Sequence, residues 1–120
     1  YFLEDLNSKL KVSKRTKASV LVRPAIIYLE NHFTEKLYVE YLAHLCNLSP
    51  SRFYSLFKEA TGCTPNDCKN ALKIQKGMEY LAETDMKVEE ISDKLSFSSA
   101  SHFRKRFKEI TGFTPKEMRK

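Results

Sequence analysis

The sequence predicts an all-α protein of about seven helices, arranged as two helix-turn-helix subdomains joined by a long linker helix. Apolar side chains recur at helical spacing along most of the chain, and no alternating strand pattern with hairpin turns is found. Glycine occurs three times in 120 residues. Residues 53–68 (FYSLFKEATGCTPNDC) return at an offset of 50 as residues 103–118 (FRKRFKEITGFTPKEM), with eight of sixteen positions identical. The repeat indicates two copies of one supersecondary unit.

Composition and charge limit the class of protein. The length fits one domain or two small lobes, and 42% of the residues are apolar. No apolar run approaches the ~20 residues that a membrane span requires. The net charge is +6, of which residues 1–23 contribute +4, residues 24–97 contribute −3 and residues 98–120 contribute +5. The second copy is therefore electropositive, either as a solvated surface or as a phosphate-facing patch.

The first part of the chain is interpreted as a junction over residues 1–20. The chain starts without Met, which favours a piece of a longer protein. One side of a short amphipathic stretch carries Phe2, Leu3, Leu6 and Leu10. This stripe either joins a dimer interface or packs locally. Residues 12–20 are polar, basic and unpatterned, which is typical of a linker.

The first helix-turn-helix is predicted over residues 21–63. Its first helix follows Pro24, with a core face of Ile26, Ile27, Leu29 and Phe33. The next helix covers about 38–46, with Val39, Leu42, Ala43 and either Leu45 or Cys46 inward. Ser49 is expected to cap the third helix and Pro50 to open it. That helix buries Phe53, Leu56, Phe57 and Ala60 and closes at Gly62 in the left-handed conformation.

The linker helix is predicted over residues 64–84 and the second helix-turn-helix over residues 85–120. Thr64-Pro65 starts the linker helix, whose apolar line is Cys68, Ala71, Leu72, Ile74, Met78 and Leu81. The second unit has helices at about 87–95 and 99–110, with core positions Val88, Ile91, Leu95, Phe103, Phe107 and Ile110. Its turn is one residue longer than the first, by Ala100. Thr114-Pro115 opens a last short helix.

The three cysteines are expected to be reduced thiols, because their odd number forms no disulfide framework. Cys63 and Cys68 align with Phe113 and Met118 in the second copy, so we interpret them as apolar core residues. The histidines supply no metal-ligand spacing, and neither a metal site nor a cofactor is predicted. The chain has no glycine-rich phosphate loop and no nucleophile elbow. An enzyme is therefore the weakest hypothesis.

In a helix-turn-helix the second helix, the recognition helix, enters the major groove. The face opposite the core carries polar residues at helical spacing in both copies. With two flanking positions, Arg52 and His102, the candidate DNA-binding residues are Ser51, Arg52, Tyr54, Ser55 and Lys58, and Ser101, His102, Arg104, Lys105 and Lys108. Arginine and lysine donate to guanine or phosphate, and serine and tyrosine donate or accept.

Each candidate has a structural alternative. Arg104, Lys105 and Lys108 are also compatible with an ordinary solvated face, and Tyr54 with packing on a neighbouring helix. His102 is either a backbone contact or a surface histidine. Arg106 takes the place of Leu56 and is interpreted as lying along the edge of the core. The linker helix, at ~1.5 Å per residue, spans roughly 27 Å, against ~34 Å between successive major grooves on one face.

The sequence resembles the AraC/XylS family of bacterial transcription regulators over about residues 23–119. The matching residues are Lys73, Ile74, Gly77, Leu81, Val88, Ile91, Ser92, Leu95, Ser96, Phe97, His102, Phe103, Phe107, Lys108, Gly112, Phe113, Thr114 and Pro115. The resemblance implies two helix-turn-helix units on one long helix, binding double-stranded DNA in the cytoplasm, associated with the nucleoid. It implies RNA polymerase as a partner, and a sensing or dimerisation domain before residue 1 through which a homodimer would form.

Several residues depart from the family pattern. Ser92 replaces a favoured Ala, Ser96 a favoured Gly, Lys73 a frequent Arg and Cys68 a frequent Tyr, and His102 stands where an aromatic is common.

The leading hypothesis is sequence-specific DNA binding that regulates transcription, with activation favoured. The alternative is a helical protein-interaction module that binds an acidic partner. A steep loss of binding with salt separates the first from the second. Because Tyr54-Ser55 differ from Arg104-Lys105, the two halves are expected to recognise different half-sites.

Overall fold

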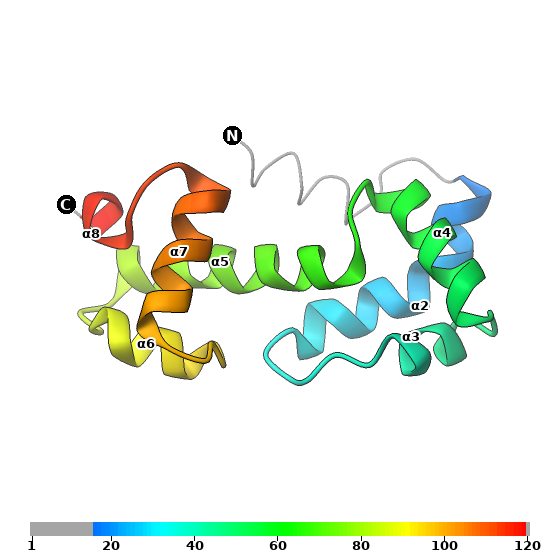
Figure 1. Ribbon diagram of the computed structural model, residues 1–120, viewed down its shortest axis with the longest axis horizontal. Helices are drawn as coiled ribbons and strands as arrows, with labels where there is room; N and C mark the ends of the chain where they lie inside the picture. The colour runs from blue at the N-terminus through cyan, green and yellow to red at the C-terminus, as the bar shows by residue number, and fades with distance from the viewer. Residues whose placement is uncertain (1–15, 120) are drawn as a thin grey trace.

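The computed structural model describes residues 16–119, and these residues form seven α-helices and no strand. The helices are α2 (Lys17–His32), α3 (Val39–Leu45), α4 (Pro50–Thr61), α5 (Pro65–Glu83), α6 (Val88–Lys94), α7 (Ala100–Thr111) and α8 (Pro115–Arg119). Figure 1 shows α5 running along the molecule between a lobe of α2–α4 and a lobe of α6–α8. The predicted all-α architecture of two units on one long helix is confirmed. The Phe2/Leu3/Leu6/Leu10 stripe lies outside the described residues.

The first helix starts earlier than the sequence suggested. α2 begins at Lys17, so the prediction of a linker through residue 20 and of a helix after Pro24 was wrong. A capping box explains the early start, because Ser19 N–H donates to Thr16 Oγ1 at 3.1 Å and Thr16 N–H donates to Ser19 Oγ at 3.0 Å. Pro24 lies inside the helix. Because its ring nitrogen has no hydrogen, the backbone there lacks one helical bond.

The new register also changes the buried face of α2. Its buried apolar residues are Ala18, Val22, Ala25, Ile26 and Leu29. Ile27, predicted in the core, is 48% exposed because it falls on the opposite side of this stripe. Phe33, at the end of α2, packs against the core of the second lobe rather than that of the first. The first lobe therefore contacts the second beyond their connection through α5.

The two turns inside the helix-turn-helix units are built alike. Leu48 N–H donates to Ala43 O and Asn47 N–H to His44 O, both at 3.0 Å. In the second unit Phe97 N–H donates to Ser92 O and Ser96 N–H to Asp93 O, again at 3.0 Å. These are the two bonds of a Schellman motif, which closes a helix through one left-handed residue. That residue is Asn47 (φ 56°) in the first turn and Ser96 (φ 62°) in the second.

Ser96→Gly is expected to stabilise the protein by about 0.5–1 kcal/mol, because a left-handed conformation strains a side chain but not glycine. The hydrogen bond that the Ser96 carbonyl accepts from Lys73 Nζ is kept, because the acceptor is a backbone atom. Urea unfolding measures the change. Ser98→Gly, in the same turn but at a residue with negative φ, serves as control and is expected to destabilise. Equal effects of the two substitutions would contradict the assignment of strain to Ser96.

The repeated Thr-Gly-x-Thr-Pro closes α4 and α7 with the same hydrogen bonds. Thr61 and Thr111 Oγ1 donate to the carbonyls of Phe57 and Phe107, each at 2.8 Å. Gly62 (φ 81°) and Gly112 (φ 84°) each donate at 2.8 Å to the carbonyl four residues before. Thr64 and Thr114 then cap the following helices, which start at Pro65 and Pro115 as predicted. The identical residues of the repeat thus hold the chain reversal after α4 and the chain reversal after α7.

The second lobe packs its core on α5. The core consists of Ile74, Leu81, Ile91, Leu95, Phe97, Phe103 and Phe107. Gly77 lets α7 approach the linker helix, because a Cβ there would lie 3.0 Å from Phe103 Cε1. Lys73 is buried on the same helix, with its Nζ donating to Ser96 O at 3.0 Å and lying 4.7 Å from the centre of the Phe97 ring. Sequence periodicity had not placed a lysine in this core.

The cysteines differ from the prediction. Cys63 and Cys68 form a disulfide, so the expectation that all three are reduced was wrong; Cys46 is free and buried. The chain reversal between α4 and α5 brings the pair together, which a count of cysteines could not show.

Within residues 16–119 no group of three potential metal ligands is found. None of the helices in that range combines the length and apolar character needed to cross a membrane.

Candidate DNA-binding interface

The candidate face of the first unit lies on α4. Phe53 and Phe57 are fully buried and fix the orientation of the helix. On the other side Ser51, Arg52, Tyr54, Ser55 and Lys58 are all exposed, with Tyr54 at 43%. Ser49 Oγ accepts from the Arg52 N–H at 3.3 Å and caps the start of the helix, as predicted. The structure therefore places the five candidates on the surface of one helix.

The candidate face of the second unit lies on α7. Phe103 and Phe107 are fully buried, and Ser101, Arg104, Lys105 and Lys108 are exposed opposite them. His102 is half-buried instead. Its Nδ1 lies 3.2 Å from Ser98 Oγ, and its ring meets the Phe97 ring edge-on with centroids 5.4 Å apart. His102 thus contributes to the packing of the turn, which leaves four exposed candidates on this helix.

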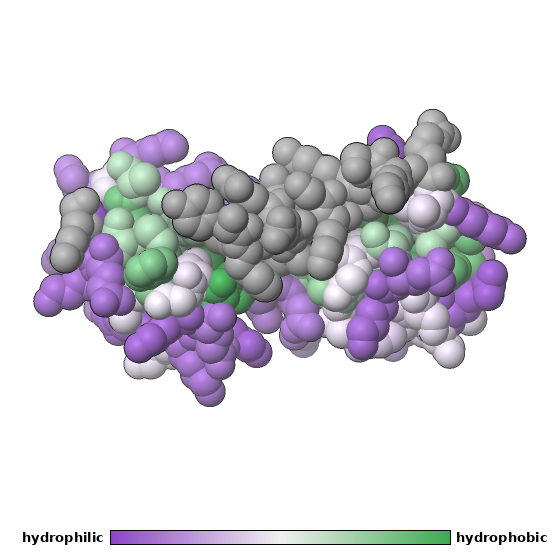
Figure 2. All heavy atoms as spheres, turned by 90° about the horizontal axis from the view of Figure 1, so that it is seen from above, coloured by the Kyte–Doolittle hydropathy of each residue, from purple (hydrophilic) through white to green (hydrophobic). Residues whose placement is uncertain are grey.

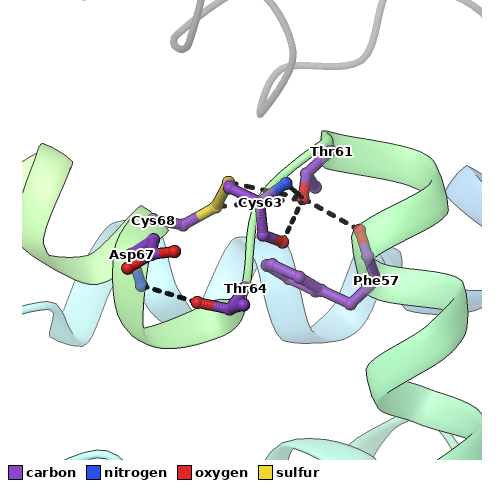
Figure 3. The surroundings of a disulfide bond; sticks show 6 residues. All are labelled: Phe57, Thr61, Cys63, Thr64, Asp67 and Cys68. Carbon is purple, nitrogen blue, oxygen red and sulfur yellow. Dashed lines mark hydrogen bonds between the residues drawn. A yellow bond between two sulfur atoms is a disulfide. The ribbon is translucent and has the colours of Figure 1, made fainter.

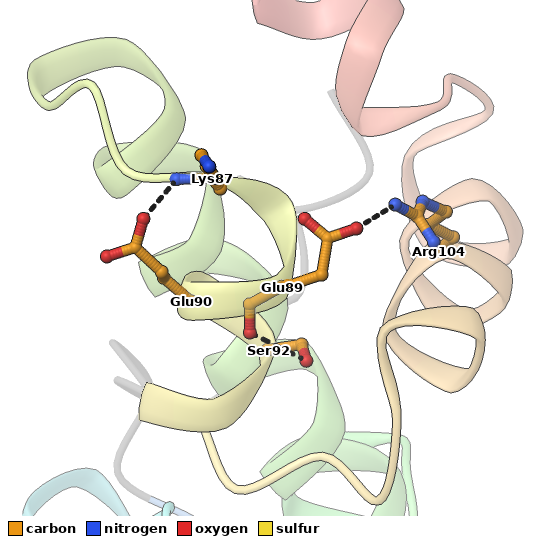
Figure 4. A network of polar contacts seen from close by, with 5 residues as sticks. All are labelled: Lys87, Glu89, Glu90, Ser92 and Arg104. Carbon is orange, nitrogen blue, oxygen red and sulfur yellow. Dashed lines mark hydrogen bonds and ion pairs between the residues drawn. The ribbon is translucent and has the colours of Figure 1, made fainter.

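Arg104 is held by a partner that the sequence did not reveal. Its Nη2 donates to Glu89 Oε2 on α6 at 2.9 Å, as Figure 4 shows. Two hydrogen bonds lower the pKa of the Glu89 carboxyl. The one from its own backbone N–H has the larger effect, and the one from Arg104 adds to it. The two side chains are 15 positions apart in sequence. Acids in a first helical turn are ordinary, so no sequence signal marked Glu89 as part of this face.

Arg106 lies beside the candidate face rather than on it. It is half-buried, and its Nη1 donates to Glu109 Oε1 at 3.2 Å. The side chains of this pair are 40% and 47% exposed, and ion pairs this accessible to water contribute about 0–1 kcal/mol. The position agrees with the interpretation that Arg106 lies along the edge of the core.

The two faces differ in charge although their scaffolds match. α7 carries four Lys/Arg and one Glu, whereas α4 carries two Lys/Arg and one Glu. Figure 2 shows hydrophilic side chains at both ends of the elongated molecule. The molecule measures 43 Å along its longest axis, and the linker helix α5 has 19 residues. Two polar helix faces are therefore carried on one elongated scaffold.

Comparison with known proteins identifies this scaffold. The family described as a helix-turn-helix domain matches residues 42–120, from within α3 through α8. The fold matches an AraC-type DNA-binding domain from Chromobacterium violaceum with a TM-score of 0.77 over 84% of this chain and 90% of that one, at 24% identity. The chain belongs to the AraC/XylS family. It corresponds to the DNA-binding domain of such transcription regulators, as the sequence resemblance predicted.

Individual members of the AraC/XylS family show how much of a protein this domain represents. The chain is 32% identical to the bifunctional transcriptional activator/DNA repair enzyme AdaA of Bacillus subtilis, over 77% of this chain and 44% of that protein. It is 32% identical to the transcriptional activator RhaS of an Enterobacter species, over 77% of this chain and 33% of RhaS. The C-terminal domain of AraT from Geobacillus stearothermophilus matches with a TM-score of 0.76 at 26% identity, covering 87% of both chains. The chain thus spans less than half the length of AdaA and of RhaS.

Proposed function

We propose that the AraC/XylS-family domain binds duplex DNA sequence-specifically, with α4 and α7 in two successive major grooves, and activates bacterial transcription. The observation that carries the proposal is the pair of exposed polar faces on the second helices of two matched units. The 19 residues of α5 span about 28 Å at ~1.5 Å per residue. The contact of Phe33 with the second core supports a fixed relation between the lobes.

The charge difference between the faces supports an asymmetric target. The α7 face is suited to guanine and phosphate through Arg104 and Lys105, whereas the α4 face offers Tyr54 and Ser55. RNA polymerase as a partner, a homodimer formed through a further domain and a cytoplasmic location remain part of the proposal.

A binding-site selection on random duplex DNA tests the central claim, which is sequence-specific binding. Enrichment of one asymmetric motif, with affinity falling steeply as salt rises, is the expected result, and recovery of no motif would refute sequence-specific binding.

Arg104→Ala and Lys105→Ala separate base contacts from phosphate contacts. A side chain that reads a base is expected to lose about 1–3 kcal/mol of discrimination at one base pair when truncated. A phosphate contact would instead weaken binding to all sequences and reduce the salt dependence. Titration of selected and single-mismatch duplexes measures both. Lys36→Ala removes an exposed lysine from the loop between α2 and α3 and is the control. Unchanged binding by both variants would exclude α7 as a recognition helix.

A further inference from the structure

Two cysteines lie on either side of the chain reversal that links the first recognition helix to the linker helix. Cys63 follows the end of α4, and Cys68 lies in the first turns of α5 (Figure 3). Their Cα atoms are 6.2 Å apart and their sulfurs are bonded. This Cα separation is within the range that a disulfide bridges without backbone movement. The bond therefore ties the C-terminal end of α4 directly to α5.

The second copy of the repeat shows that this reversal does not need sulfur. Phe113 and Met118 stand at the equivalent positions. The bonds around the turn are nevertheless the same: Thr61 and Thr111 Oγ1 each accept from the N–H two residues on, at 3.3 and 3.1 Å. Both glycines adopt the same left-handed conformation. The cysteine pair is thus an addition to a turn that already closes, present in one copy only.

The two cysteines differ in solvent accessibility, and the turn can accommodate them both as thiols and as a disulfide. Cys63 is half-buried, whereas Cys68 is fully buried. Thr61 Oγ1 lies 3.5 Å from Cys63 Sγ and 3.8 Å from Cys68 Sγ. When reduced, the Cys68 thiol could donate its proton to this oxygen. Cys46 is a useful contrast, because it is buried elsewhere in the lobe and burial raises the pKa of its thiol.

We propose that Cys63 and Cys68 form a reversible thiol–disulfide site that sets the affinity of the domain for DNA, with a low-molecular-weight disulfide such as glutathione disulfide as oxidant. The more accessible Cys63, as thiolate, attacks one sulfur of glutathione disulfide and releases one glutathione thiolate. The Cys68 thiolate then attacks Cys63 Sγ and releases the second. The two protons lost by the cysteines pass to the two glutathione thiolates, so the protein is oxidised by two electrons and the glutathione disulfide is reduced.

The consequence for DNA rests on the proposed function. The disulfide limits movement of α4 relative to α5, and so fixes one recognition helix relative to the other. Pre-organised binding surfaces lose less entropy on association. The oxidised domain is therefore expected to bind a duplex carrying both half-sites about fivefold more tightly than the reduced domain. A duplex carrying only the half-site of α7 should show no such difference, because one unit alone does not depend on the angle between the lobes.

Thiol labelling and DNA titration together test the proposal. The protein is equilibrated in glutathione buffers of increasing glutathione disulfide fraction, and free thiols are counted by mass after alkylation. Wild type should change from three labelled cysteines to one, and Cys46→Ala from two to none, with the labelling carried out in denaturant. The matched variant Cys63→Phe/Cys68→Met reproduces the second copy, and its DNA affinity should be independent of redox state. Reduction of the oxidised wild type with dithiothreitol should restore the weaker binding.

The outcomes separate this proposal from the proposed function. Failure of Cys63 and Cys68 to oxidise together would overturn the site whether or not the protein binds DNA. Oxidation with no change in affinity for the two-half-site duplex would overturn its regulatory effect. If neither redox form binds any duplex, the proposed function and the regulatory effect fail together, while the thiol count still decides whether the reversible site exists.

Discussion

Gly77→Leu is expected to lower the free energy of unfolding by about 3 kcal/mol, the upper part of the range for overpacking a filled core. A Cβ on Gly77 would lie 3.0 and 3.1 Å from two ring carbons of Phe103, and 3.3 Å from Leu95 Cδ1. Both neighbours are almost completely buried, so neither can move into solvent. Leucine has a higher helix propensity than glycine by about 0.5–1 kcal/mol, which offsets only part of this cost.

Denaturant unfolding followed by circular dichroism measures the loss. Ala82→Leu is the matched control, because it adds a leucine to an exposed position of the same helix α5. The control is expected to stay within about 0.5 kcal/mol of wild type. Gly77→Leu should also weaken binding to DNA containing the half-site of α7, since α7 packs on α5 through Phe103. A Gly77→Leu protein as stable as the control would show that α5 and α7 are not packed this closely.

Lys73→Met is expected to remove a rise in stability between about pH 7.5 and pH 9.5. Burial of the ammonium group lowers the pKa of Lys73 from 10.5 to about 8, and the charge of Lys69 adds to the effect. Below pH 8 the lysine is charged in both the folded and the unfolded protein, and the cost of burying the charge is present in full. Between about 8 and 10.5 the unfolded state binds more protons, so stability rises with pH. Between pH 7.5 and pH 9.5 the expected rise of wild type relative to Lys73→Met is about 2 kcal/mol.

The comparison of variants isolates Lys73 from other groups that titrate in the same range. Wild type, Lys73→Met and Lys73→Arg are unfolded with urea at several pH values. Lys73→Arg keeps a donor for the Ser96 carbonyl, but arginine does not lose its proton in this range, so its stability should stay parallel to that of Lys73→Met. Lys76→Met, at a more exposed lysine paired with Glu79, should follow wild type. A constant difference between wild type and Lys73→Met at all pH values would refute the lowered pKa.

The sequence predicted most of the secondary structure because its signals are local. Ser49-Pro50, Thr64-Pro65 and Gly62 mark helix ends by their own backbone preferences, and the structure has them at those ends. The start of α2 was missed because Pro24 was taken as a first-turn residue. The capping pair that opens the helix, Thr16 and Ser19, is a local signal too, but a serine in the third position is a weaker mark than the usual Glu or Gln.

The sequence by itself determined the two matched units, their long connector and the ten candidate residues, because helix periodicity and caps act over a few positions. Tertiary structure alone decided which residues of separate elements come into contact. Glu89 meets Arg104, Phe33 reaches the second core, and Cys63 bonds Cys68 across a chain reversal. The buried position of Lys73 under the turn at Ser96 also depends on how α5 meets the second unit. Such contacts depend on helix packing angles and on distances between separate elements, and no pattern of neighbouring residues encodes those.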